Sequence, residues 1–197
     1  MFCLFAGPFL QLLGDCLWLT RNYNFSWNIW REEASVFFIP AGFLFAKVIE
    51  RKSFWWSVTC CGLFVIGCIG AAAMMPLFRL SAFYPVVGHN GFPTVVASVM
   101  DKKLFAVTLF PLGLCFPVSL VLFGVAMLKY KVLNIVAGIA LIISGVLFWT
   151  GNAGEVDSIL IIGDVWLLVT FCYVGYVTFR VTIDSYTEKL FVPTAHF

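Results

Sequence analysis

Charge is the scarcest property of this chain. Of its 197 residues only 11% are Asp, Glu, Lys or Arg, whereas a typical soluble domain carries about 25%. Twelve basic and ten acidic residues leave a formal net charge of +2, and they are scattered along the chain. A nucleic-acid-binding surface needs clustered basic residues, so we expect no nucleic-acid partner.

Histidine is nearly absent as well. The two histidines, His89 and His196, lie outside the long apolar runs, which excludes a bis-histidine haem and disfavours a multi-histidine metal site. The sequence contains no H-E-x-x-H pair, Walker loop or Ser-His-Asp set. Its seven cysteines include no C-x-x-C pair and act as small apolar residues. We therefore expect no cofactor and no bound metal, and we favour a non-enzymatic protein over a membrane enzyme.

Apolar residues, by contrast, make up 62% of the chain, and the mean hydropathy is +1.00. A helix that crosses a bilayer takes about 20 apolar residues, so six spans would fill about 120 residues. The pattern predicts an all-α integral membrane protein built as a six-helix transmembrane bundle. The expected spans cover residues 2–20, 34–48, 54–78, 104–128, 132–150 and 158–179, in a single membrane domain over 1–183 that a short polar tail follows over 184–197.

The first two runs need separate arguments. The run over 2–20 has neither a basic n-region nor a small-residue cleavage site, so we expect a retained helix rather than a signal peptide. The run over 34–48 is short and holds Pro40 at its middle, which makes it the weakest span. Between them, residues 22–33 interleave aromatic rings with amides and charges, which is typical of an interfacial segment in the headgroup layer.

The distribution of basic residues predicts the orientation. If both termini are cytoplasmic, the inner side holds Lys47, Arg51, Lys52, Lys129, Lys131, Arg180 and Lys189, and the outer side holds Arg21, Arg31, Arg79, Lys102 and Lys103. The connection over 151–157 has two acidic residues and no basic residue, which suits the outer side. We therefore predict cytoplasmic termini and an outer location for the long loop over 80–103.

Two carboxylates lie inside apolar runs, Asp15 in the first and Asp164 in the last. At ~1.5 Å per residue, both lie about 9–10 Å below the predicted outer boundary. Because an unpartnered carboxylate in hydrocarbon is costly, each should face the bundle, be protonated or meet a partner such as Arg31. These positions predict a polar cavity open to the outside that binds a proton, a cation or a small polar ligand. The alternative is two structural hydrogen-bonding sites near the interface.

Four further residues are candidates for the same site. Asp157 lies seven residues before Asp164 on the same helical face, and Glu155 lies just above it. Arg31 and Glu33 stand at the start of the second run. Together they would form a gate or ligand clamp over the carboxylates. The alternative is ordinary helix-end electrostatics, in which the acidic Glu33 complements the dipole of that helix.

Small residues suggest where helices pack closely. Gly67 and Ala71, four residues apart, give the run over 54–78 a smooth side. That side packs inside the chain, or else against another membrane protein or a second copy. Our preferred hypothesis for the function is a non-enzymatic membrane subunit or accessory protein that packs against another membrane protein. The expected partners are therefore that protein and the membrane lipids. The alternative is a small transporter or ligand-binding membrane protein that uses the outer-facing carboxylates.

Overall fold

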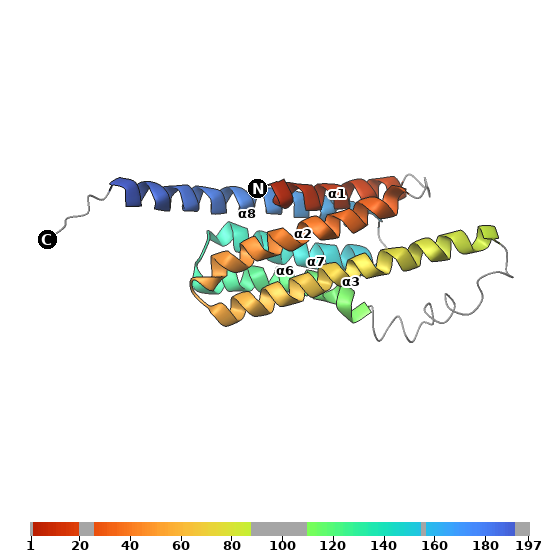
Figure 1. Cartoon of the computed structure of the whole chain (residues 1–197), viewed down its shortest axis with the longest axis horizontal. Coiled ribbons are helices and arrows are strands. Elements are labelled where there is room, and N and C mark those ends of the chain that lie inside the picture. Colours follow the sequence, from red (N-terminus) through yellow and green to blue (C-terminus); the bar gives the residue numbers. More distant parts are fainter. Residues whose placement is uncertain (1, 20–25, 88–109, 155–156, 192–197) are drawn as a thin grey trace.

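The computed structural model describes the backbone of residues 2–19, 26–87, 110–154 and 157–191, and this part of the chain is entirely helical (Figure 1). The helices are α1 (Phe2–Leu19), α2 (Ser26–Glu50), α3 (Phe54–Val87), α6 (Phe110–Tyr130), α7 (Ile135–Gly154) and α8 (Asp157–Phe191). Four of them contain apolar stretches long enough to cross a membrane: Phe54–Ala73, Pro111–Tyr130, Ile135–Asn152 and Asp157–Arg180. The predicted all-α membrane bundle is confirmed. His89 and His196 lie outside the described residues.

α1 and α2 are not among those four helices. The apolar part of α1, Phe2–Leu17, is shorter than a full span. α2 has 25 residues and continues through Pro40, so at ~1.5 Å per residue it is about 37 Å long. Charged residues near both its ends, among them Arg31 and Lys47, reduce its hydropathy. Length therefore permits α2 to cross a bilayer, and the six crossings stay a prediction.

Three helices extend farther than the sequence pattern predicts. α2 begins at Ser26, so residues 26–33 of the expected interfacial segment form its first two turns. α3 continues to Val87, which makes residues 80–87 of the expected loop helical, and α8 continues to Phe191 through much of the expected tail. Once a helix has nucleated, each added residue contributes a backbone hydrogen bond, and this outweighs weak local turn signals.

The described helices form a closed ring in chain order, in which each packs against the next and α8 returns to α1. Their directions alternate, and α3 and α8 project beyond the ring at opposite ends (yellow-green and blue in Figure 1). We call the end that holds Asp15 and Asp164 the carboxylate end. The opposite end, with the α2–α3 turn at residues 51–53 and the α6–α7 turn at residues 131–134, is the turn end.

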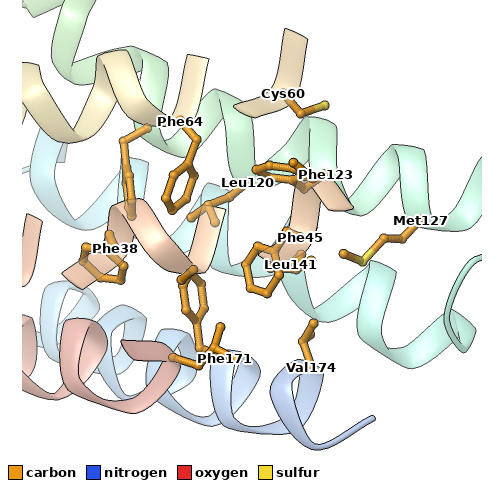
Figure 2. Close-up of a cluster of buried hydrophobic side chains, with 14 of the residues drawn as sticks. Phe38, Phe45, Cys60, Phe64, Leu120, Phe123, Met127, Leu141, Phe171 and Val174 are labelled. Carbon is orange, nitrogen blue, oxygen red and sulfur yellow. The ribbon is translucent and has the colours of Figure 1, made fainter. Parts of the chain in front are cut away.

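Phenylalanine side chains fill the centre of the ring (Figure 2). They contact one another at ring-centroid distances of 5.0–6.4 Å and link α2 to α6 across the ring. This phenylalanine core consists of Phe38 and Phe45 from α2, Phe64 from α3, Phe116 and Phe123 from α6, and Phe171 from α8. The ring therefore encloses close-packed aromatic side chains between its carboxylate end and its turn end.

α3 and α6 approach each other most closely around Gly67. A methyl group at Gly67 would stand 2.3 Å from the backbone nitrogen of Phe116, and one at Gly70 would stand 2.7 Å from Cβ of Leu112. Ala71 is half-buried. Gly67 thus packs inside the fold, which supports the internal alternative for this small-residue side.

Candidate functional site

The polar residues at the carboxylate end continue the buried faces of their helices. On α8 the buried positions follow a 4-3-4-3 spacing through Leu160, Asp164, Leu167, Phe171 and Val174. On α1, Gln11 and Asp15 lie on the buried side, and on α2, Arg31 lies one turn before the buried Ala34. The helix faces that build the phenylalanine core therefore also bring these polar side chains together.

Asp15 is fully buried and has a partner for each oxygen. Its Oδ1 lies 2.9 Å from Nε of Arg31, in an ion pair that joins α1 to α2. Nε2 of Gln11, one turn earlier on α1, donates a hydrogen bond to Oδ2 at 2.9 Å. The Asp15 carboxylate therefore has both an opposite charge and a neutral donor, which offset the cost of its burial.

Arg31 lies between the buried carboxylates and the exposed rim of the bundle. Its side chain is 15% exposed, and Nη2 donates to Oδ1 of Asn152 at 3.2 Å. Asn152 is exposed near the end of α7, where its Nδ2 donates to the carbonyl of Phe148 at 2.8 Å. Arg31 thus joins α2 to both α1 and α7.

Asp164 lacks comparable partners. It is 1% exposed, and its carboxyl group lies within hydrogen-bonding reach of the Asp15 carboxyl, a contact that needs a proton on one of the two groups. No other described residue donates a hydrogen bond to its oxygens. Its carboxyl group lies close enough to Asp15 for the two groups to interact directly, and the charge of Arg31 also reaches it. An unsatisfied buried polar group costs about 1–3 kcal/mol, and more when it is charged. The Asp164 carboxyl therefore has no hydrogen-bond donor other than a protonated Asp15, and the nearby Arg31 charge is already paired with Asp15.

The charges of this cluster do not balance when both carboxyl groups are ionised. Asp15 and Asp164 then carry two negative charges, and Arg31 supplies one positive charge. A single proton, a monovalent cation or an ammonium group of a ligand would complete the cluster. Among the described residues no group of three or more His, Cys, Asp or Glu side chains is placed to hold a metal ion.

The structure brings together three of the residues predicted from the sequence: Asp15, Asp164 and Arg31. Asp157 and Glu33 are exposed and have no hydrogen bond or ion pair with this cluster. Glu155 lies outside the described residues. The use of the cluster as a ligand site stays a prediction.

Sequence reasoning missed Gln11 and Asn152. Gln11 is an amide within an apolar run, one helical turn before Asp15, and this spacing was the available signal. Asn152 lies in a polar connection where nothing in the sequence separates it from its neighbours. Its contact with Arg31 joins residues 121 positions apart and depends on how the ring closes.

The phenylalanine core lies directly below the polar cluster. Phe38 follows Arg31 by seven residues on α2, and Phe171 follows Asp164 by seven on α8, which places each pair on one helix face. Phe148, whose carbonyl binds Asn152, packs its ring on Phe116 at a centroid distance of 5.0 Å. The cluster is therefore shielded by aromatic side chains on the side facing the turn end.

Comparisons of the chain with protein-family models, with curated proteins and with solved structures gave no match. The fold and the site themselves define the class, an all-α membrane-embedded protein with a buried carboxylate cluster at one end of a helical ring.

Proposed function

We propose that the protein is a small transporter or ligand-binding membrane protein that takes up one positive charge, a proton or a monovalent cation, between Asp15 and Asp164. One observation carries this proposal: both oxygens of Asp164 are buried beside a second carboxyl group, and no described N–H or hydroxyl group donates to them. A purely structural carboxylate would be expected to have its partners built in, as Asp15 has.

The contacts suggest different tasks for the three charged residues. Asp164 binds the incoming charge, because no described N–H or hydroxyl group donates to its oxygens. Asp15 is held in place by Arg31 and Gln11 and supplies the second negative group. Arg31, the most exposed of the three, controls access from the carboxylate end by exchanging between Asp15 and an open position.

The phenylalanine core limits what the described conformation can do. Phe38 and Phe171 close the bundle below the carboxylates, so a charge taken up at Asp164 has an apolar layer between it and the turn end. Transport would therefore require helices to rearrange around the bound charge, as in alternating access. The base distribution favours an outer carboxylate end and cytoplasmic termini in a multi-pass protein.

The accessory-subunit hypothesis stays a prediction. It rested on the lack of catalytic motifs and on a small-residue side that a partner helix could use. In the structure Gly67, the centre of that side, lies against α6 of the same chain. The buried carboxylate pair is therefore the stronger basis for a function.

The test measures the thermal stability of the purified protein in neutral detergent. One series varies the pH at constant ionic strength, and another compares Na⁺, K⁺ and Li⁺ with N-methylglucamine at constant pH. Uptake of a proton stabilises the wild type as the pH falls, and uptake of a metal cation stabilises it above the N-methylglucamine baseline. At a hundredfold excess over Kd, the melting temperature should rise by about 5–10 °C.

Asp164→Asn is the decisive variant, because its amide carries no charge and cannot take up the proton or the cation. It should lose this dependence, whereas Glu33→Gln, which neutralises an exposed carboxylate on α2, should retain it. The proposal would be refuted if the melting temperature of the wild type changed with pH and cations no more than that of Asp164→Asn. It would also be refuted if Asp164→Asn kept the full change in melting temperature.

A further inference from the structure

The turn end carries exposed cations on two different turns. Three flank the α2–α3 turn and two flank the α6–α7 turn, and all have exposed side chains: Lys47, Arg51, Lys52, Lys129 and Lys131. None of them forms an ion pair with a carboxylate whose side chain the structure describes. Glu50 is exposed among them, so the charge of this surface is predominantly positive.

Aromatic contacts hold the two turns together. The rings of Trp56 on α3 and Tyr130 on α6 meet edge to face at a centroid distance of 6.5 Å. Nζ of Lys129 lies over both rings, 5.2 Å from the centroid of Trp56 and 5.4 Å from that of Tyr130. Oγ of Ser57 donates to the carbonyl of Ala46 at 2.8 Å and joins α3 to α2. The two turns that carry the cations are therefore held side by side.

Lys131 occupies a backbone position that usually holds glycine. Its φ of 49° is in the left-handed region. Its amide donates to the carbonyl of Leu128 at 3.3 Å, and the amide of Val132 donates to that of Met127 at 3.2 Å, which together form a Schellman motif at the end of α6. A lysine in this conformation stabilises the fold less than glycine would. The turn nevertheless carries a cation at its tip.

Exposed aromatic residues stand next to these cations. Phe54 and Trp55 open α3 directly after the turn, and they are 57% and 77% exposed. Tryptophan at a helix end prefers the headgroup layer of a bilayer, where one side of the ring meets hydrocarbon and the other meets water. With Trp55 in that layer, the neighbouring cations would meet the lipid phosphates.

We propose that this turn-end platform, made of the five cations with Phe54 and Trp55, binds the headgroup phosphate of an anionic phospholipid. The cations pair with the negatively charged phosphate, and the exposed rings of Phe54 and Trp55 contact the glycerol and upper acyl chain. A soluble anion would use the cations but not the rings, which favours a lipid. This proposal does not depend on the carboxylate cluster, because it uses residues at the opposite end of the bundle.

The experiment titrates the purified full chain in neutral detergent with phosphatidylglycerol or phosphatidylcholine and measures bound lipid by native mass spectrometry. The wild type should bind phosphatidylglycerol in preference to phosphatidylcholine. Each neutralised platform cation should weaken phosphatidylglycerol binding about fivefold, so Lys129→Gln/Lys131→Gln should weaken it about 25-fold. Glu33→Gln, which removes an exposed charge at the opposite end of the bundle, is the control and should bind as the wild type does.

A second variant separates lipid binding from folding, because Lys129→Gln also removes the contacts with Trp56 and Tyr130. Lys131→Gly should raise the melting temperature without lipid, since glycine suits the left-handed position, and should still weaken phosphatidylglycerol binding about fivefold. Unchanged binding in both variants would overturn the proposal. Equal binding of phosphatidylcholine, or displacement of the lipid by inorganic phosphate at equal concentration, would also overturn it.

Discussion

The carboxyl groups of Asp15 and Asp164 meet inside the bundle, yet their surroundings differ in every contact that the structure describes. Asp15 has Arg31 on one oxygen and Gln11 on the other. Asp164 has a second carboxyl group beside it, and no described N–H or hydroxyl group donates to its oxygens. One residue type thus supports two tasks, a built-in ion pair and a group open to an added charge.

This difference predicts opposite sensitivities to the same substitution. Asp15→Asn removes the carboxylate paired with Arg31 and leaves a largely buried guanidinium with only the Asp164 carboxyl nearby, so it should lower the free energy of unfolding by about 1–3 kcal/mol. Asp164→Asn supplies an amide donor toward the Asp15 carboxylate, so its effect should stay within about 1 kcal/mol of the wild type or stabilise the protein. Thermal unfolding in detergent measures both changes. Equal losses from the two variants would show that both carboxylates are structural.

The charged members of this cluster could be predicted from the sequence, because a charged residue inside an apolar run is visible in the local pattern. Asp15 and Asp164 stand out in apolar runs, and each needs a partner within reach. Asp157 was expected to join them from its seven-residue spacing, but it is the first residue of α8, one turn outside the buried stripe that begins at Leu160. Asn152 could not be predicted, since only the closure of the ring brings it to Arg31.

At the scale of the elements, helix contacts depend on single missing methyl groups. Gly67 and Gly62 lie on the same helix, α3, but face different surroundings. A methyl group at Gly67 would meet the backbone of Phe116 at 2.3 Å, whereas one at Gly62 would meet no atom within 4 Å. Comparing substitutions at these two glycines therefore separates the contact between α3 and α6 from the general effect of glycine on helix stability.

Gly67→Ala should therefore lower the free energy of unfolding by about 1–3 kcal/mol, because α3 and α6 must move apart. Gly62→Ala should leave it unchanged or raise it by about 0.5–1 kcal/mol, since alanine is the better helix former. Chemical denaturation in mixed micelles compares the two variants. A neutral Gly67→Ala would show that the two helices do not approach each other in this way.

The spans of α3, α6, α7 and α8 could be predicted from hydrophobic runs alone, because each has an apolar stretch of 18 residues or more. The start of α2 at Ser26 could not be predicted in this way. Its first turns contain Arg31 and Glu33, which count as charges in any hydropathy sum. In the fold Arg31 forms an ion pair with Asp15 of α1. A hydropathy sum over α2 alone cannot include this compensating charge.

The whole molecule is asymmetric along its long axis, with acids buried at one end and cations exposed at the other. If the turn end faces the cytoplasm, a cysteine at Lys52 should react with an impermeant maleimide only after cells are opened. A cysteine at the exposed Asp157, at the carboxylate end, should react in intact cells. The unsubstituted chain gives the background from its own cysteines. The reverse labelling pattern would invert the orientation.

The phenylalanine core also determines how the protein would respond to membrane voltage. An electric field across a bilayer is concentrated in the layer that polar groups and water do not reach, and in the described bundle Phe38, Phe64, Phe116 and Phe171 form such a layer. Asp15 and Asp164 lie on one side of it, and Arg31 and Asn152 continue the polar cluster from them to the exposed rim. Binding of a charge there would depend only weakly on voltage. Movement of that charge past the aromatic rings would involve about 2.3 kcal/mol of electrical work per 100 mV.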